Sequence, residues 1–224
     1  MKPWRSCVIL AGVLALAASG RAPAQTGEKA LANLHGAVTY LAYPDGAEHA
    51  VAPAASILLH DDDVAKTGDA SMGAIELPDS SRVLLGSDTT IKLDAFDAAG
   101  AQAHFVVFNG KLRFRVEHPQ GAKADYTFTT PTGTIAVRGT EGDISADPVD
   151  GVRVNVYHLS DPSLPVHVTM LDGTQFDVPA GQKLWMRWER GKLVGKVLPL
   201  TKAEIQRFSE FGPPTTIDGG APAR

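Results

Sequence analysis

The sequence predicts an all-β domain, either a sandwich or a short stacked-strand coil built from β-hairpins, with one short C-terminal helix. From Gly36 to Leu198, short runs rich in Val, Ile, Leu, Phe and Thr are separated by turn residues, at about the 8–12-residue spacing typical of all-β domains. Several runs alternate apolar and polar residues, as a strand with one buried face does. No window from 36 to 198 sustains a helical period, which argues against a sheet with crossover helices.

Residues 1–24 are predicted to form a secretory signal peptide. Lys2 and Arg5 precede an apolar run from Cys7 to Ala18, and small residues at Ala22 and Ala24 suit cleavage after Ala24. The run is shorter than the roughly 20 residues that span a bilayer. The mature protein is therefore expected to be periplasmic or secreted, with no membrane span.

Cleavage also changes the chemistry of the mature chain. It removes the only Cys, so no disulfide can form, and it removes Lys2, Arg5 and Arg21 but no acidic residue. The 21 basic residues of the whole chain become 18 against 25 acidic ones, a net charge of −7. An acidic balance of this size argues against nucleic acid as a partner.

The β domain is assigned to residues 30–198. Turn signals occur at Pro44-Asp45-Gly46, Asp150-Gly151 and Asp172-Gly173. Further turn signals are Pro78-Asp79-Ser80, Ala99-Gly100, Pro119-Gln120-Gly121 and Ala180-Gly181. The clearest hairpin is predicted over 105–117, because Asn109-Gly110 suits a type I′ turn with positive φ at both central residues.

The second half of this hairpin carries three alternating cations. Period two places Lys111, Arg113 and Arg115 on one face of the strand and apolar residues on the other. The cations are candidates for holding an anionic ligand such as a phosphate or uronate. The alternative is a solvated outer face in which the aliphatic stems cover apolar surface.

A second candidate patch lies at 183–189. Alternation places Leu184, Met186 and Trp188 in the core, and Trp185 and Arg187 among charges on the other face. An exposed tryptophan beside cations can stack on a sugar ring or a protein partner. The open alternative is that the terminal helix covers Trp185.

The helix is predicted over 199–212. Thr201 and Glu204 have the spacing of a capping box, Ile205 and Phe208 are three residues apart, and Gly212 begins a Gly-Pro-Pro stop. The remaining residues, 213–224, are rich in Gly, Pro and Ala and are predicted to be a disordered tail.

The order of strands and turns resembles the FecR domain family. The resemblance is carried by the Thr67-Gly68 turn, the Leu77–Ser81 turn, the segment from Phe128-Thr-Thr-Pro131 to Val137-Arg138-Gly139-Thr140, and the closing Val178–Gln182 turn. In the V-R-G-T segment, Arg138 is interpreted as structural, with Gly139 allowing a bend and Thr140 bonding nearby backbone.

The resemblance implies the fold and a periplasmic setting. The best-known family members are transmembrane regulators of a sigma factor, with an anti-sigma segment and a membrane helix ahead of the periplasmic domain. Here the predicted signal leads directly into the β domain, so the chain is expected to be a stand-alone FecR-domain protein.

No residue pattern points to catalysis, a cofactor or a metal. The seven histidines make no H-E-x-x-H or H-x-H pattern, and G-x-S-x-G and Walker motifs are absent. In the acidic run 60–63, three adjacent carboxylates cannot all point at one ion, and in the run 141–150 Pro148 stands where a calcium loop needs Gly. The predicted function is a non-enzymatic binding, sensor or scaffold module for an envelope protein or glycan. The alternative is a secreted enzyme that acts on cell-envelope polymers.

Overall fold

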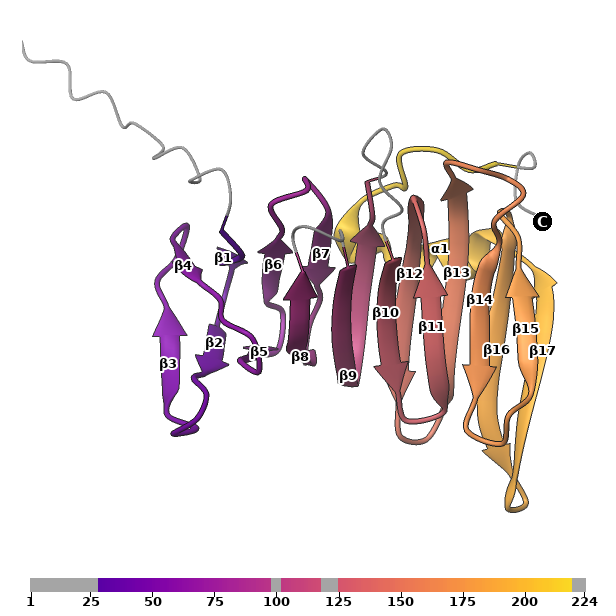
Figure 1. Ribbon diagram of the computed structural model, residues 1–224, viewed down its shortest axis with the longest axis horizontal. Coiled ribbons are helices and arrows are strands. Elements are labelled where there is room, and N and C mark those ends of the chain that lie inside the picture. The colour runs from indigo at the N-terminus through magenta and orange to yellow at the C-terminus, as the bar shows by residue number, and fades with distance from the viewer. Residues whose placement is uncertain (1–27, 98–101, 118–124, 219–224) are drawn as a thin grey trace, which may run out of the picture.

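The computed structural model describes residues 28–97, 102–117 and 125–218. The predicted signal peptide and the predicted turns at 99–100 and 119–121 lie outside this part of the chain. Within it, 17 strands form two β layers that are joined through one shared strand, with a short helical segment at the C-terminal end (Figure 1).

The two layers share a simple alternating topology. In spatial order, sheet A consists of β4 (Ser56–Leu58), β1 (Ala30–His35), β6 (Met72–Glu76), β7 (Arg82–Leu85), β9 (Gln102–Arg115), β12 (Thr140–Asp147), β13 (Gly151–Leu159), β16 (Gln182–Glu189) and β17 (Lys192–Pro199). Sheet B consists of β3 (Glu48–Val51), β2 (Val38–Leu41), β5 (Val64–Thr67), β8 (Thr90–Asp97), β9 again, β10 (Asp125–Thr130), β11 (Gly133–Val137), β14 (Val166–Met170) and β15 (Gln175–Val178).

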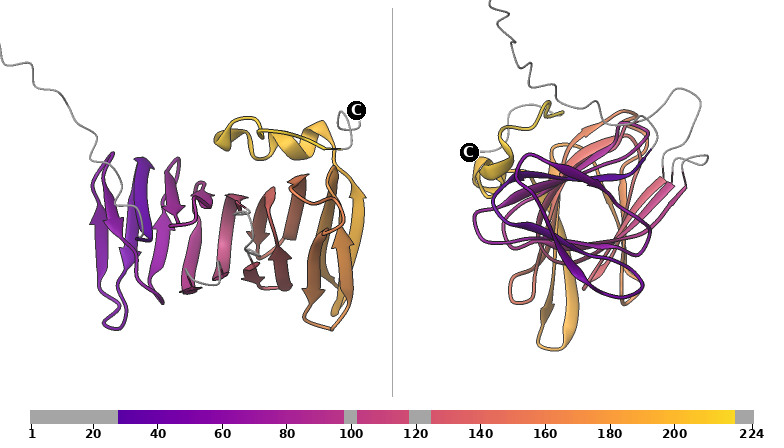
Figure 2. Two further views of the ribbon diagram at one scale, coloured as in Figure 1. Left: turned by 45° about the horizontal axis from the view of Figure 1, so that its top comes forward. Right: turned by 90° about the vertical axis from the view of Figure 1, so that its left-hand side faces the viewer.

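The chain passes repeatedly from one layer to the other and advances along the stack as it does so. Seen along the long axis, the strands surround a common interior (Figure 2). The prediction of an all-β fold is therefore confirmed, and the structure combines both forms that the sequence left open: two facing sheets and a coil of stacked strands. Among the described strands, only the pair β9–β10 is parallel.

Aromatic rings fill the interior where the two layers meet at β9. Phe105 and Phe114, from the two halves of this strand, are both fully buried. The ring of Phe128 stacks on Phe105 with centroids 5.2 Å apart and lies 5.2 Å from the centroid of Phe114. A single core cluster extends from Leu31 in β1 to Met186 in β16. One continuous interior therefore unites the described strands.

The predicted hairpin at 105–117 is wrong. Residues 102–115 form one continuous strand, β9, whose first half pairs in sheet B and whose second half pairs in sheet A. Only Gly110 has positive φ, at +103°, whereas a type I′ turn needs it at both central residues. A Cβ on Gly110 would lie 2.4 Å from Thr89 Cα, so glycine here permits a close backbone approach rather than a reversal.

The helical prediction near the C-terminus is confirmed in kind but is shorter than expected. The structure has an α-helix, α1 (Lys202–Gln206), and a 3₁₀ turn, η1 (Ser209–Phe211). Thr201 Oγ1 accepts from the Glu204 backbone N–H at 3.3 Å, which is one half of a capping box. The Glu204 carboxylate turns instead toward Lys183 in β16.

The described part of the predicted disordered tail, residues 213–218, lies against the β domain. Thr215 N–H donates to Glu141 Oε1 at 2.9 Å, and Asp218 N–H donates to the Tyr157 carbonyl at 2.8 Å. These contacts correct the prediction of disorder for residues 213–218. Composition indicates the local flexibility of a segment, but it does not show whether distant residues bind that segment. We refer to residues 200–218 as the cap.

The structural reading of the V-R-G-T segment is confirmed. Gly139 has φ +55°, and Thr140 Oγ1 donates to the Arg138 carbonyl at 3.0 Å. The Arg138 side chain pairs with Asp125 in the neighbouring region of sheet B. The segment thus ends β11 and redirects the chain into β12 of sheet A.

Candidate interaction face on sheet A

The residues singled out in the sequence come together on the outer face of sheet A. Cross-strand pairing places Lys111 opposite Ser145, Ser145 opposite Arg153, and Arg153 opposite Trp185. This row continues to Lys196 of β17. Two candidate patches from distant parts of the sequence therefore belong to one surface. We call the line of residues Lys111, Ser145, Arg153, Trp185 and Lys196 the tryptophan row.

A parallel polar row lies one pair further along the same strands. Its members face one another in the order Arg113, Asp143, Asn155 and Lys183. We call this the buried row, because the cap crosses it. Arg113 is 6% exposed, and Asp143 and Asn155 are fully buried.

Arg113 is committed to a structural ion pair and is not a free anion-binding cation. Its Nε donates to Asp143 Oδ1 at 2.6 Å, and Nη2 donates to Oδ2 at 3.0 Å. Nη1 donates to the Gly212 carbonyl of the cap at 2.8 Å. The guanidinium also lies over the rings of Tyr157 and Phe211, 5.3 and 5.5 Å from their centroids. This arrangement corrects the expectation that all three cations of this strand form one open binding face.

Burial and pairing shift the pKa values in this cluster. Burial raises the pKa of Asp143, and the hydrogen bonds and charge of Arg113 oppose that rise. Burial works to lower the pKa of Arg113, but the contacts with Asp143 outweigh it and leave this pKa above its ordinary value. Burial also raises the pKa of the Tyr157 hydroxyl, which donates to Asp143.

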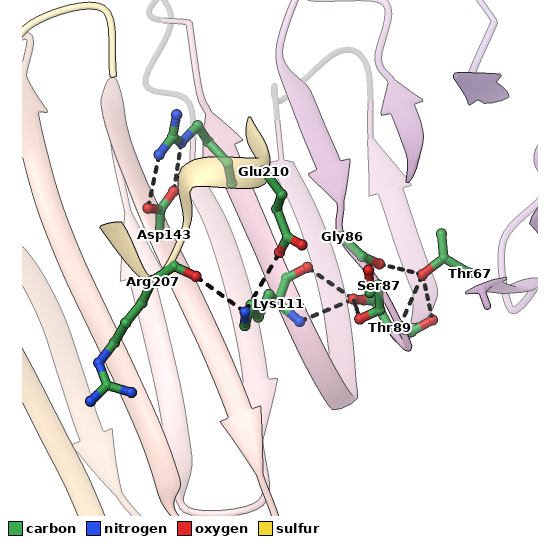
Figure 3. Close-up of polar contacts among 9 residues, drawn as sticks. Thr67, Gly86, Ser87, Thr89, Lys111, Asp143, Arg207 and Glu210 are labelled. Carbon is green, nitrogen blue, oxygen red and sulfur yellow. Dashed lines mark hydrogen bonds and ion pairs between the residues drawn. The ribbon is translucent and has the colours of Figure 1, made fainter. Parts of the chain in front are cut away.

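The other two cations of this strand remain partly accessible. Lys111 Nζ donates to the Arg207 carbonyl at 3.1 Å and lies 3.9 Å from Glu210, both in the cap (Figure 3). Arg115 Nε lies 2.7 Å from Glu117, and the Arg115 side chain is 55% exposed. The three cations share a face, as the alternation predicts, but the cap divides them into one buried and two accessible groups.

Trp185 is half-buried. The contacts described for its ring are with Arg187 and Asp150, and none of them is with the terminal helix. The Arg187 guanidinium lies 4.0 Å from the centroid of the Trp185 ring. Trp185 Nε1 donates to the Asp150 carbonyl at 3.0 Å. The predicted pairing of Trp185 with Arg187 is therefore present as a stacked aromatic–cation patch.

The prediction that Trp188 lies in the core is wrong. Its side chain is 58% exposed, although Leu184 and Met186 on the same face are fully buried. Trp188 pairs with Leu193 next to the turn at Arg190-Gly191, where the β16–β17 hairpin extends past the other strands (Figure 1). The alternation continues there, but no facing sheet remains to bury the ring.

A groove of about 560 Å³ adjoins the tryptophan row. Its cations are Lys111, Arg153 and Arg207, and the exposed ring of Phe108 supplies apolar surface beside the buried Phe208. Its acidic residues are Asp88, Asp147 and Asp150. Asp147 accepts from two backbone N–H groups of its own turn, and Asp150 lies 3.6 Å from Arg153. Sequence patterning missed this groove, because its lining comes from four separate segments.

The carboxylates of the acidic run 60–63 form ion pairs and hydrogen bonds within the domain. In the 60–63 run, Asp61 pairs with Lys29, Asp62 pairs with Lys92, and the buried Asp63 accepts from the backbone N–H groups of Tyr43 and His60. In the described residues, no group of three or more His, Cys, Asp or Glu side chains is placed to hold a metal ion.

Sheet B carries one arrangement with the hydrogen-bond order of a catalytic triad. On its outer face, His104 Nδ1 lies 2.8 Å from Asp94 Oδ2, and His104 Nε2 lies 2.9 Å from Thr129 Oγ1. A hydrolytic triad also needs N–H donors directed at the developing oxyanion. On this face the strand N–H groups point along the sheet to neighbouring strands. Hydrogen bonding from Lys92 holds the pKa of Asp94 below its ordinary value, so the trio is part of a charged cross-strand network.

Comparison with known proteins assigns the middle of the chain to a family. Residues 63–158 match the family model described as FecR protein. This segment is a FecR-type domain. It runs from the start of β5 to the end of β13, so it contains most of the buried row and the cationic half of β9.

One solved structure supports the fold. A candidate anti-sigma factor from Parabacteroides distasonis aligns with 16% identity and a TM-score of 0.52, over 66% of this chain and 64% of that one. A second chain from the same organism, also described as a candidate anti-sigma factor, aligns with 17% identity and a TM-score of 0.48, over 59% and 58%. The comparison with curated proteins finds no match. In the part of the chain that the structure describes, no helix is long and apolar enough to cross a membrane.

Proposed function

We propose that this chain is a periplasmic, non-enzymatic module that binds an envelope protein or glycan and serves as a sensor or scaffold. The observation that carries the proposal is the FecR match over strands β5–β13, which build most of the outer face of sheet A. The family is regulatory, and the face combines an aromatic ring with several cations. We assign binding to the tryptophan row and its groove, with Lys111, Trp185 and Arg187 as contact residues and Arg115 at the far side of the cap.

The chemistry of this surface suits an anionic partner. The mature chain has a predicted net charge of −7, yet Arg153, Arg187 and Lys196 adjoin Trp185. Lys111 lies further along the same row, beyond Ser145. A local positive field on an acidic protein orients an anionic partner as it approaches. A rigid aromatic ring adds contact area at low entropic cost. An acidic protein surface and a uronate- or phosphate-bearing glycan share this chemistry.

A capture experiment with two tryptophan variants tests the assignment. Tagged mature protein is cross-linked in periplasmic extract of its native host and, separately, incubated with purified peptidoglycan sacculi. We expect Trp185→Ala to reduce capture about tenfold, equivalent to about 1.4 kcal/mol. Trp188→Ala is the matched control, since it removes an exposed ring from the opposite face of the same hairpin.

Equal capture by wild type, Trp185→Ala and Trp188→Ala would remove the tryptophan row from the proposal. Thermal melting of each variant is measured in parallel, because a folded Trp185→Ala protein is needed for the comparison.

N-terminal sequencing of the periplasmic material should give Gln25 as the first residue. An intact Met1 would contradict export with cleavage after Ala24.

The alternative, a hydrolase, is favoured by one observation, the Asp94–His104–Thr129 trio. We expect 4-nitrophenyl acetate hydrolysis by the wild type to match that of Thr129→Val, since the trio lacks directed oxyanion donors. His167→Ala is a control for general imidazole reactivity, because His167 Nδ1 lies 2.9 Å from Asp177 in a similar exposed pair. A rate that falls at least tenfold in Thr129→Val but not in His167→Ala would establish the enzyme instead.

A further inference from the structure

The cap meets the face of sheet A through complementary charges. Lys183 Nζ donates to Glu204 Oε1 at 2.6 Å, and both side chains are largely buried, 14% and 11% exposed. Lys111 and Arg113 donate to backbone carbonyls of Arg207 and Gly212. The cations of the face thus donate hydrogen bonds to a carboxylate and to carbonyl oxygens of the cap.

Aromatic rings form the second part of this contact. Phe208 is 1% exposed, and its ring centroid lies 6.5 Å from that of Phe211. Phe211 covers the Arg113 guanidinium. The face therefore binds a segment in which a carboxylate contacts Lys183 and a pair of aromatic rings, further along the chain, lies near Arg113.

The cap has the properties of a segment that can leave without unfolding the domain. Its α-helix has five residues and its 3₁₀ turn has three, and helices of this length are not stable alone. Backbone hydrogen bonds join it to the sheet at its two ends, Leu200 N–H to the Gly181 carbonyl and Asp218 N–H to the Tyr157 carbonyl. Between them, each hydrogen bond described to the sheet involves a side chain. A segment attached mainly through side chains can open at a free energy below that of global unfolding.

The face beneath the cap also retains unused hydrogen-bonding capacity. Asn155 is fully buried between Asp143 and Lys183 in the buried row. Its side-chain amide interacts with the Tyr157 hydroxyl and makes no other hydrogen bond with the described residues. An amide carries two donors and an acceptor oxygen, so part of its hydrogen-bonding capacity is open to an occupant of this face.

We propose that the buried row of sheet A is a peptide-binding face and that the cap is its resident, displaceable occupant. The partner is a protein segment that carries a carboxylate for Lys183 and an aromatic ring for Arg113, in the arrangement of Glu204 and Phe211. This inference rests on the proposed function as a binding module and names a second surface and its partner class. Displacement of the cap also releases Lys111, which couples the buried row to the groove beside Trp185.

A labelled synthetic peptide with the sequence of residues 200–218 provides the probe. The wild-type chain binds it weakly, because its own cap competes at high effective concentration. In Glu204→Lys the resident cap is repelled by Lys183, and we expect the peptide to bind at least about tenfold more tightly than to wild type, as measured by fluorescence anisotropy. Glu204→Gln is a milder second variant, used if Glu204→Lys fails to fold.

A charge exchange makes the result specific to Lys183. The Lys183→Glu protein should lose the wild-type peptide and bind a peptide in which Glu204 is replaced by Lys. Glu48→Lys is the matched control, since Glu48 pairs with Lys66 in sheet B, and it should bind the peptide as weakly as wild type.

Three outcomes would overturn the proposal. The first is equal peptide affinity of wild type and both folded Glu204 variants. The second is binding of the wild-type peptide to Lys183→Glu that is as tight as its binding to Glu204→Lys. The third is a concentration-dependent dimer of Glu204→Lys in size-exclusion chromatography, which would make a second copy the occupant. The probe comes from this chain, so each outcome is independent of whether envelope partners are captured at the tryptophan row.

Discussion

Arg113→Ala is expected to lower the free energy of unfolding by about 3–5 kcal/mol, as removal of one partner from a buried ion pair does. The substitution leaves the fully buried Asp143 carboxylate without its two guanidinium bonds. It also removes the cation beneath Phe211 and the donor to the Gly212 carbonyl. Urea titration followed by tryptophan fluorescence gives the difference.

Arg115→Ala is the matched control, two residues along the same face of β9. Arg115 is 55% exposed and pairs only with Glu117 in the described contacts, and such surface pairs contribute about 0–1 kcal/mol. Equal losses in the two variants would contradict the distinction between a buried and an accessible cation. The double variant Arg113→Met/Asp143→Leu should recover most of the stability, because it removes both buried charges together.

The loss in Arg113→Ala should grow with pH. Burial already raises the pKa of Asp143, and Arg113 opposes the rise, so removing Arg113 raises this pKa further above its unfolded value. A carboxyl with a raised folded-state pKa imposes no ionisation penalty below its unfolded pKa, and the penalty builds up as the pH rises toward the folded-state pKa. Unfolding at pH 4 and pH 7 should therefore show the smaller deficit at pH 4.

Gly110→Ala is expected to cost about 3 kcal/mol or more. Two effects add at this position: a φ of +103°, which costs an L-residue about 1–2 kcal/mol, and overlap of the new Cβ with Thr89. The overlap is severe, since the distance to Thr89 Cα would be 2.4 Å, and overpacking against fixed groups costs about 1–3 kcal/mol. Thr89 cannot move freely, because its hydroxyl bonds both the carbonyl and the N–H of Lys111 (Figure 3).

Gly173→Ala separates the two effects. Gly173 has a similar φ, +85°, but nothing lies within 4 Å of a Cβ placed there. Its substitution should cost only the backbone term, about 1–2 kcal/mol. If both alanine variants melt at the same temperature, the close approach to Thr89 contributes nothing and β9 tolerates a side chain at its crossing point.

Much of the fold follows from local patterns in the sequence. Period-two alternation identifies the inward residues of the second half of β9 and of β16 up to Met186, because a strand buries every second side chain wherever a facing sheet exists. The turns at Gly46, Gly151, Gly173 and Gly181 all have positive φ. The capping residue Thr201 is equally local. These features depend on a few consecutive residues, which is why the sequence predicts them.

Local signals fail where a distant segment decides the outcome. Asn109-Gly110 is a strong hairpin signal, yet the chain continues straight from sheet B into sheet A. The type I′ backbone, with positive φ at both turn residues, occurs instead at Arg190-Gly191, where composition gives only a weak indication. At Gly110, pairing on both sides with β7, β8, β10 and β12 outweighs the turn preference of two residues.

The candidate site was also only partly predictable. Alternation correctly groups Lys111, Arg113 and Arg115 on one face, and Trp185 with Arg187 on another strand. It does not reveal that β12 and β13 join these strands into one surface, or that the cap buries Arg113 against Asp143 while Trp188 lies beyond the facing sheet. By itself the sequence determined which side chains share a face along β9 and β16, since that depends on backbone geometry. Only the tertiary structure decided which strands are neighbours and where the sandwich ends, because these depend on contacts between segments far apart in the chain.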